Sequence, residues 1–424
     1  MKKLISFFAK TVLFIAFLSG FGWMVKHNVK GDRGFGILDN AIRELYNFPD
    51  LFVQSAKEVT SLPGTFVKTP ANFEKINSLE NDIQILTSYT NSKNERTVEL
   101  KNLKNDEVMY SWEIDNPHAD HARIMDPIVF EDKSLCYSFN GVTGLRMIDS
   151  VGNLKWKQDS IAHHHSMNLD SSGNIWACTY TKDSQGFIIY RGKYRVDGNE
   201  VHFIDNTISN IEANTGKILY HKSVSEILVE NNLTHLYIQS DRKEDPLHIN
   251  DVQPALKTTA FYKEGDVFIS SRNLSCILHF RPKTNELVKL IQGPFSSQHD
   301  IDFLNDSTLV FFNNNSYGIG GYPGINWPIA KEPMDLGDNF SFIYHYNLRT
   351  GEFTPAEKEL FAENEIFTFT EGMQEYLQDG SIFIEEQNSG VLWVIKDHKI
   401  RYKGVFKSHE EGYHHLPNWI KVIR

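Results

Sequence analysis

The stretch Gly293–Ser316, GPFSSQHDIDFLNDSTLVFFNNNS, decides the fold because it contains one complete strand–turn–strand unit. His299 heads a short apolar strand, the polar turn Asn305–Ser307 follows, and Thr308–Phe312 forms a second apolar strand. The same layout returns several times along the chain. We therefore interpret the unit as a structural repeat and His299 as a candidate chemical centre.

Two kinds of segment alternate from about residue 81 onwards. One kind is a hairpin of two apolar or aromatic strands joined by a short polar turn. The other kind is a single strand headed by histidine or glutamine, and it falls between the hairpins. The hairpins span residues 97–112, 145–156, 211–220, 277–288, 342–353 and 391–400, and the single strands begin at His121, His165, His248, His299, Gln374 and His415.

This alternation predicts an all-β fold, a six-bladed β-propeller spanning residues 81–424. Each single strand is expected to be the inner strand of a blade, and each hairpin is expected to be an outer pair. The first hairpin has no single strand before it, and the last single strand has no hairpin after it. Joining these two ends in one blade leaves no sheet edge open, which favours a closed propeller over a sandwich.

The N-terminus predicts export of the rest of the chain. Basic residues, among them Lys2 and Lys10, precede the apolar run Thr11–Val25. We expect residues 1–26 to form an uncleaved signal anchor, a transmembrane helix, with a cleaved signal peptide as the alternative. Residues 27–80 are expected to form a juxtamembrane stalk that is partly helical.

Charge and cysteine content exclude other classes of function. The chain has 43 Lys and Arg against 54 Asp and Glu, a net charge of −11, so we expect no nucleic-acid partner. The three cysteines, Cys136, Cys178 and Cys276, match neither the spacing of a zinc motif nor a disulfide framework. We expect them to be buried free thiols.

The heads of inner strands in a propeller line one mouth of its central channel, so the histidines are expected to converge there. A structural alternative is a repeat consensus in which each histidine bonds the backbone of a neighbouring blade. Where the ring is functional, one chemistry is a metal site and the other is nucleophilic and acid–base catalysis on an anionic group. Few carboxylates flank the histidines and no HExxH motif occurs, which disfavours a metal site.

Arg272, in the run Ile269–Asn273, is expected to supply the cation for an anionic substrate. Its planar fork matches a sulfate or phosphate group better than lysine does. Besides the central histidines, we expect the substrate to be contacted by His121, His164, Asn250, Gln374 and His415.

Several segments together resemble one known family. They are DPLHINDV at Asp245–Val252, ISSR at Ile269–Arg272, GPFSSQHD at Gly293–Asp300, the pair His164-His165, and QEYLQDG at Gln374–Gly380. This succession is similar to that of the bacterial arylsulfate sulfotransferases (the arylsulfotransferase family). The resemblance covers about residues 110–400.

The resemblance implies an exported six-bladed propeller that moves a sulfuryl group from a phenolic sulfate ester to a phenol, without a nucleotide sulfate donor. His299 resembles the family's nucleophile, which becomes transiently sulfated. His248 and Arg272 resemble its sulfate-binding pair, and His165 (or His164) resembles its remaining channel histidine. No metal or cofactor is implied.

The expected partners are therefore a small aryl sulfate, a phenol and, through the N-terminal helix, a membrane, with a homodimer as a further expectation. The expected location of the propeller is the periplasmic side of the inner membrane. Two alternatives remain open: a non-catalytic, membrane-tethered propeller that binds a ligand or protein partner, and a metal-dependent propeller lyase or hydrolase.

Overall fold

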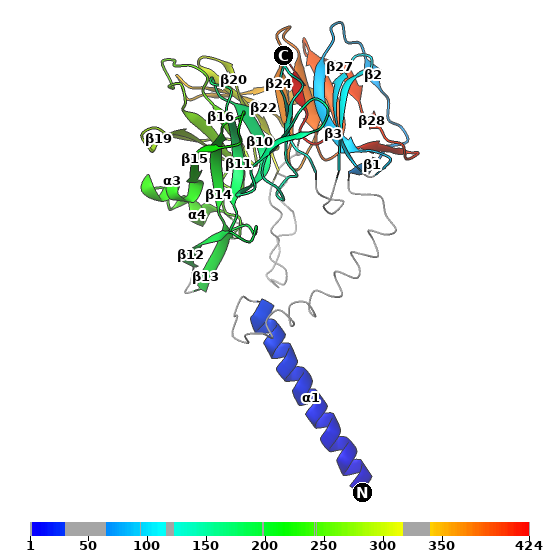
Figure 1. Cartoon of the computed structure of the whole chain (residues 1–424), viewed down its shortest axis with the longest axis vertical. Coiled ribbons are helices and arrows are strands. Elements are labelled where there is room, and N and C mark those ends of the chain that lie inside the picture. Colours follow the sequence, from blue (N-terminus) through cyan, green and yellow to red (C-terminus); the bar gives the residue numbers. More distant parts are fainter. Residues whose placement is uncertain are drawn as a thin grey trace, which may run out of the picture. The chain divides into compact units, whose positions relative to one another are not determined.

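The computed structural model describes residues 2–29, 65–93, 95–115, 123–196, 199–240, 242, 244–316 and 340–423 (Figure 1). The chain divides into two compact units, Met1–Pro63 and Gly64–Arg424. The first unit contributes one described element, and the second contains all the sheets.

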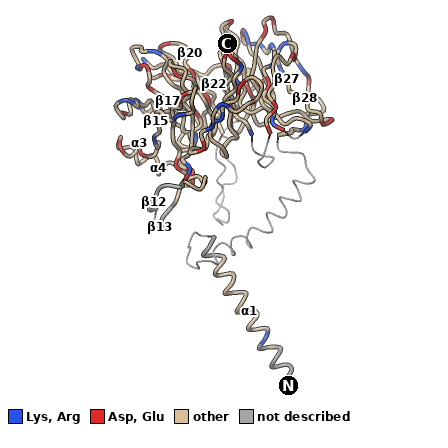
Figure 2. Tube along the Cα trace, viewed as in Figure 1, with Lys and Arg blue, Asp and Glu red and all other residues tan. Residues whose placement is uncertain are grey.

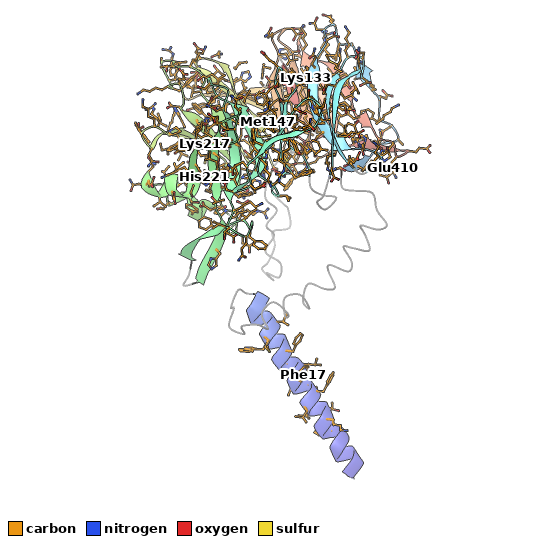
Figure 3. All side chains as sticks on the ribbon, viewed as in Figure 1. Phe17, Lys133, Met147, Lys217, His221 and Glu410 are labelled. Carbon is orange, nitrogen blue, oxygen red and sulfur yellow. The ribbon has the colours of Figure 1, made fainter. Side chains whose placement is uncertain are left out.

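The first unit contains the helix α1, Lys2–Val29. The side chain of Phe17 projects from this helix, and it is 69% exposed (Figure 3). Among the described residues, no helix combines the length and the apolar character needed to cross a membrane. The helix is therefore present where the sequence predicts one, but the predicted membrane crossing is not supported.

The second unit is all-β, and its described residues contain six antiparallel sheets of four or five strands. Within each sheet, strands that are close in sequence lie side by side (Figure 1). In the first sheet, the C-terminal strand β30 pairs with β3 through Leu86↔Lys421 and Gln84↔Ile423. In their order within each sheet, the strands of the first sheet are β30 (Lys421–Ile423), β3 (Gln84–Thr90), β4 (Arg96–Asn102) and β5 (Val108–Ile114), and those of the second are β6 (Ile128–Val129), β7 (Leu135–Tyr137), β8 (Arg146–Ile148) and β9 (Leu154–Lys157). The third sheet contains β10 (Ile161–Leu169), β11 (Ile175–Thr181), β14 (Asn206–Ile211) and β15 (Ile218–Ser223), and the fourth contains β16 (Ile249–Pro254), β17 (Val267–Ser271), β18 (Cys276–Arg281) and β19 (Glu286–Gln292). The fifth sheet contains β20 (His299–Asn305), β21 (Thr308–Asn313), β22 (Phe342–Asn347) and β23 (Phe353–Ala356), and the sixth contains β24 (Met373–Tyr376), β25 (Ile382–Glu386), β26 (Val391–Lys396), β27 (Lys399–Gly404) and β2 (Ile76–Asn77).

Smaller elements complete the unit. A three-stranded sheet contains β1 (Phe66–Lys68), β29 (Tyr413–His415) and β28 (Phe406–Lys407), and a two-stranded one contains β12 (Tyr190–Val196) and β13 (Asn199–Ile204). Three short helices connect strands: α3 (Val224–Glu230), α4 (Leu236–Gln239) and α5 (Lys358–Glu363). Each of the six hairpins expected from the sequence is the outer pair of strands of one large sheet; in the sheet that also contains β2, that pair is β26 and β27.

Hydrogen bonds that involve the first strands, the residues just before them or, in one link, Glu385 of β25 join the six sheets in sequence order and return to the first. In most of these links a side-chain oxygen of one sheet accepts a backbone N–H of the next. The donor–acceptor pairs are Met167 to Asp126 (2.5 Å), Val252 to Ser166 (3.1 Å), Ile301 to Asp251 (2.7 Å), Gln374 to Asp300 (2.7 Å), Ile420 to Glu385 (2.6 Å), and Asp126 N–H to the Asn418 carbonyl (3.3 Å).

Neighbouring sheets are held together by apolar side chains, whereas charged residues lie mostly outside. Trp176 of β11 and Ile269 of β17 belong to one buried cluster between adjacent sheets. Burial of such side chains contributes about 25 cal/mol per Å² of apolar surface. Acidic and basic residues are interspersed along the chain trace (Figure 2).

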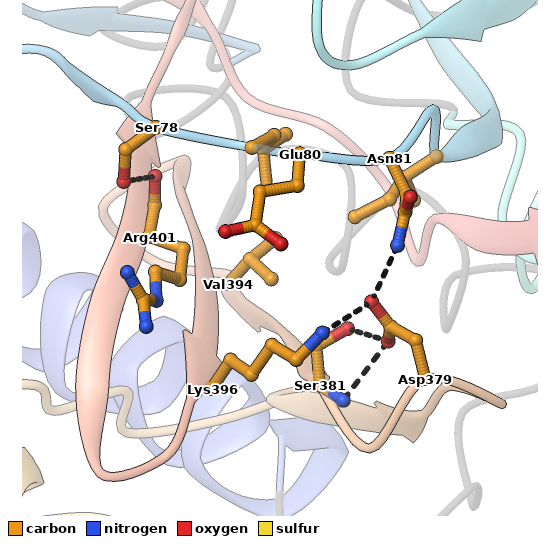
Figure 4. A pocket seen from close by; sticks show the side chains of 10 residues that line it. Ser78, Glu80, Asn81, Asp379, Ser381, Val394, Lys396 and Arg401 are labelled. Atoms are coloured by element: carbon orange, nitrogen blue, oxygen red, sulfur yellow. Dashed lines mark hydrogen bonds and ion pairs between the residues drawn. The ribbon is translucent and has the colours of Figure 1, made fainter.

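The arm that precedes β3 is fixed to the last large sheet (Figure 4). Its strand β2 pairs with β27, and the Ser78 N–H donates to the Arg401 carbonyl at 2.8 Å. Asn81 donates to the Asp379 carboxylate at 3.0 Å, and Lys396 pairs with the same carboxylate at 3.0 Å. Residues 65–80, which the sequence analysis assigned to a stalk, thus extend existing sheets, and residues 30–64 of that stalk lie outside the described residues.

Candidate functional site

Three histidines and one tryptophan from four sheets meet where the first strands begin. His165 lies in β10, His248 precedes β16, His299 begins β20 and Trp419 lies just before β30. The ring centroid of His165 is 5.0 Å from that of His248, 6.2 Å from that of His299 and 5.7 Å from that of Trp419. The rings of His299 and Trp419 are 6.1 Å apart. We call these four residues the histidine cluster.

The backbone is left-handed at three members of the histidine cluster. φ is 61° at His165, 44° at His248 and 52° at Trp419. A left-handed non-glycine residue costs about 1–3 kcal/mol, so its neighbours must hold it in place. The Asn140 side chain accepts the His165 N–H at 3.1 Å, and Asp245 accepts the His248 N–H at 3.1 Å.

The hydrogen bonds of His299 determine which of its ring nitrogens has the proton. Nδ1 faces two acceptors, Asn314 Oδ1 at 2.7 Å and the Ser297 carbonyl at 3.0 Å. Exchanging the oxygen and nitrogen of the Asn314 amide would break a hydrogen bond, because its Nδ2 donates to the Thr368 carbonyl at 2.9 Å. Nδ1 therefore has the proton, and the Nε2 lone pair is directed to the Glu371 N–H at 3.3 Å.

Burial keeps the imidazoles of His299, His165 and His164 uncharged. Burial, followed by the positive charge of Arg272, lowers the pKa of His299 to about 3. Burial, followed by the charge of His248, holds the pKa values of His164 and His165 well below the ordinary range. His299 is therefore a neutral imidazole near pH 7, the form in which a ring nitrogen can act as a nucleophile.

His248 is paired with a half-buried carboxylate. Its Nδ1 donates to Asp245 Oδ2 at 2.5 Å, and Asn206 donates to the other oxygen of Asp245 at 2.9 Å. Burial raises the pKa of Asp245, but the hydrogen bond and charge of His248, together with the hydrogen bond from Asn206, outweigh burial and hold that pKa below its ordinary value. The carboxylate thus fixes a proton on Nδ1 and orients the ring, so Nε2 is the nitrogen that can give or take a proton.

Arg272 places a cation and an aromatic surface next to the cluster. Its backbone N–H donates to the His248 carbonyl at 3.1 Å, and its Nη1 donates to Asn273 Oδ1 at 2.9 Å. Its Cζ lies 5.9 Å from the ring centroid of Phe369, a side chain that is 41% exposed. An exposed aromatic ring beside a guanidinium suits a ligand that has both an aryl group and an anionic group.

Three other residues predicted to contact substrate are buried behind the cluster and bond to protein groups. His164 Nδ1 lies 2.9 Å from Nδ1 of His165. Asn250 donates to the Gln298 carbonyl at 2.7 Å, which fixes the backbone just before His299. Gln374 bonds through its backbone and side chain to two aspartates of β20. In this structure these three side chains support the site's geometry.

His415 lies elsewhere than the repeat pattern predicts, and this expectation needs correction. It belongs to β29 of the three-stranded sheet, not to the first strand of a large sheet. Its ring stacks on Tyr89 with centroids 4.4 Å apart and contacts Phe66 at 5.2 Å. Pro417 follows and cannot donate to a strand ladder, so the first strand begins only at β30. The predicted contact His121 lies outside the described residues.

The structure adds four residues that the sequence analysis did not single out as part of the site: Asn314, Trp419, Arg123 and Glu371. Asn314 could have been identified from the sequence, because it follows β21, the strand that pairs with the strand of His299. Trp419 stands where a histidine was expected. Arg123 and Glu371 form an ion pair between residues far apart in sequence, which no motif could indicate.

Within the ranges that the structure describes, no group of three or more His, Cys, Asp or Glu side chains could hold a metal ion. The site has the parts needed for group transfer to a ring nitrogen: a neutral nucleophile, a cation and a paired acid–base group.

Comparison with known proteins gives one match in sequence and several in structure. The sequence profile of the arylsulfotransferase (ASST) family matches residues 127–403. No curated protein matches the chain. A protein of unknown function from Bacteroides caccae has 11% identity and a TM-score of 0.50, with 81% of this chain and 99% of that chain covered.

Two further solved structures are similar at lower scores. A virginiamycin B lyase from Staphylococcus aureus has 12% identity and a TM-score of 0.40, covering 80% of this chain and 89% of that chain. The WD40 β-propeller domain of Doa1 has 8% identity and a TM-score of 0.39, covering 80% and 86%.

Proposed function

The chain belongs to the arylsulfotransferase (ASST) family, and on this premise we propose that it transfers a sulfuryl group from a phenolic sulfate ester to a phenolic acceptor through a sulfated His299. The family implies a transferase. The reaction proposed here uses two half-reactions on one histidine and requires no nucleotide sulfate donor.

The observation that carries the proposal is the orientation of His299. Two acceptors hold the proton on Nδ1, so the lone pair is on Nε2. This lone pair attacks sulfur once the substrate displaces the long hydrogen bond from the Glu371 N–H. As the Nε2–S bond forms, the S–O bond to the aryl group breaks and its electron pair leaves on the phenolate oxygen. The sulfated ring keeps its Nδ1 proton and becomes cationic, and the hydrogen bond to Asn314 then stabilises that charge.

His248 is proposed to be the general acid and base for the phenolic oxygens. Its Nε2 protonates the leaving phenolate in the first half-reaction and removes the proton of the acceptor phenol in the second. Asp245 keeps the ring oriented and stabilises its charged form through the bond at 2.5 Å. Arg272 is proposed to bind the sulfuryl oxygens, where negative charge must be stabilised during transfer.

The aryl group is proposed to lie between Arg272 and the solvent, against the exposed face of Phe369. The support is the position of that ring, 5.9 Å from the guanidinium carbon and 41% exposed. Trp419 then forms the inner wall, with its Nε1 fixed by the Glu371 carbonyl at 3.0 Å. Offset or edge contacts between aromatic rings of this kind contribute about 0.5–1.5 kcal/mol each.

We further propose that the six large sheets are the blades of a six-bladed propeller, closed by pairing of β30 with β3. The support is the series of hydrogen bonds that links the six sheets in sequence order and returns to the first sheet. In such a fold the histidine cluster lies at one mouth of the central channel, where a small ester can enter.

A transfer assay tests the proposal. Wild-type protein and the His299→Ala variant are incubated with 4-nitrophenyl sulfate and phenol, and release of 4-nitrophenol is measured. We expect transfer by the wild type and none by His299→Ala, while His398→Ala, which changes a histidine whose side chain is 87% exposed, behaves like the wild type. Turnover by His299→Ala at the wild-type rate would refute the proposed nucleophile.

A further inference from the structure

The segment Thr368–Glu371 forms one wall of the histidine cluster through its main chain. The Thr368 carbonyl accepts from Asn314, the Glu371 N–H points to His299 Nε2 at 3.3 Å, and the Glu371 carbonyl accepts from Trp419 at 3.0 Å. Glu371 is left-handed, with φ of 61°. Its backbone therefore cannot move away from the nucleophile without losing these bonds, and its side chain stays near the cluster as well.

This placement puts a carboxylate beside a site that is proposed to bind an anion. The Glu371 side chain is only 13% exposed, so water and salt screen its charge poorly. A sulfate ester is negatively charged, and an uncompensated carboxylate in this wall would repel it. Like charges placed close together in a partly buried site are strongly unfavourable.

Arg123 compensates that charge. Its Nη2 donates to Glu371 Oε1 at 2.8 Å and its Nη1 to Oε2 at 3.1 Å, a two-pronged pair in which both carboxylate oxygens are used. The arginine side chain is 20% exposed and comes from the segment before β6. Its charge also reaches the cluster: after burial and the neighbouring histidines, it contributes to the low pKa of His165.

We propose that Arg123 is a positioning residue that neutralises Glu371 and thereby lets the histidine cluster accept a sulfate ester. Arg123 acts through Glu371 and does not itself bind the sulfuryl oxygens, which are bound by Arg272. The inference rests on the proposed function only for the class of ligand, an anionic sulfate monoester.

Binding and rescue test the inference. Full-length protein with His299→Ala, which removes the covalent step, is titrated calorimetrically with 4-nitrophenyl sulfate at low ionic strength. In this background Arg123→Gln is expected to weaken binding about 10- to 100-fold, the size expected of one uncompensated charge. Adding Glu371→Gln is expected to restore binding to within about threefold, because the repelling charge is then gone.

Two further readouts separate this role from a structural one. Raising the ionic strength is expected to reduce the penalty of Arg123→Gln, since salt screens repulsion. In the active protein the same substitution is expected to raise KM more than it lowers kcat. As a matched control, Arg146→Gln breaks a surface pair, 2.9 Å from Asp159, and is expected to leave binding unchanged.

The inference is overturned if the double variant binds as weakly as Arg123→Gln, because Arg123 would then contact the anion directly. It is also overturned if the parent shows no binding. Should Arg123→Gln fail to fold, Glu371→Gln alone decides: binding at least as tight as the parent supports the inference, and a tenfold loss refutes it. Absence of transfer by the wild type, with this binding pattern intact, would refute the proposed reaction and leave the inference standing.

Discussion

Asn314→Leu tests how the nucleophile is prepared. The substitution keeps the branched shape of a fully buried side chain but removes the acceptor that lies 2.7 Å from His299 Nδ1. The Ser297 carbonyl, at 3.0 Å, remains as the second acceptor, so the proton is held less strongly and not released. The bond matters most when the sulfated ring is cationic, because hydrogen bonds to charged groups contribute about 1.5–3 kcal/mol.

That range corresponds to a loss of about 10- to 150-fold in kcat. KM is expected to change little, because Asn314 does not face the substrate. The assay is steady-state transfer from 4-nitrophenyl sulfate to phenol, with kcat and KM determined separately. The variant is also expected to lose about 1–3 kcal/mol of stability, since the Thr368 carbonyl then keeps only the longer hydrogen bond from Ser341 Oγ, at 3.5 Å.

Asn210→Leu is the matched control for the loss of stability. Asn210 is also buried and donates to Asp170 at 2.9 Å, but it lies in β14 and makes no bond to the cluster. We expect it to lower the free energy of unfolding without lowering kcat. An Asn314→Leu variant with wild-type kcat would refute the account of the tautomer, whatever its stability.

Further predictions concern acid catalysis, the aryl contact and pH. Asp245→Asn is expected to slow transfer from esters of weakly acidic phenols at least about tenfold more than transfer from 4-nitrophenyl sulfate, because a poor leaving group needs its proton; an equal effect on both would contradict the role of His248. Phe369→Ala is expected to raise KM for 4-nitrophenyl sulfate about three- to tenfold, the value of one aromatic contact, whereas Phe187→Ala, which removes another exposed ring, leaves KM unchanged. Because burial lowers the pKa of His299 to about 3, the unfolded chain takes up a proton there below pH of about 6.5 while the folded chain does not, so stability falls as the pH falls. Between pH 7 and 4 the wild type is expected to lose about 3 kcal/mol more than His299→Gln in urea unfolding, and equal losses would refute the shift.

Much of the fold could be predicted because the repeat has a local signature. A hairpin with a polar turn identifies itself in sequence, and all six expected hairpins occur as outer strand pairs. The strand heads His165, His248 and His299 could be aligned for the same reason. The end of the chain misled the repeat comparison, because Pro417 separates His415 from the short strand β30, and the side chain that reaches the cluster is Trp419.

What the sequence could not give is the orientation of each group. The proton on His299 is placed by Asn314, and the orientation of Asn314 is in turn fixed by Thr368. Thr368 lies in the segment that precedes β24, the first strand of another sheet. The pair of Arg123 and Glu371 joins positions that are distant along the chain. Such contacts depend on how sheets pack against one another, which hydrophobic periodicity does not encode.

The most direct test of the central claim is chemical identification of the intermediate. The wild-type protein is incubated with an aryl sulfate in the absence of a phenol, digested, and analysed by mass spectrometry for a sulfated histidine. We expect one sulfuryl group on the peptide that contains His299, and its loss when a phenol is added. No modification, or a sulfuryl group on His165 or His248 instead, would contradict the account.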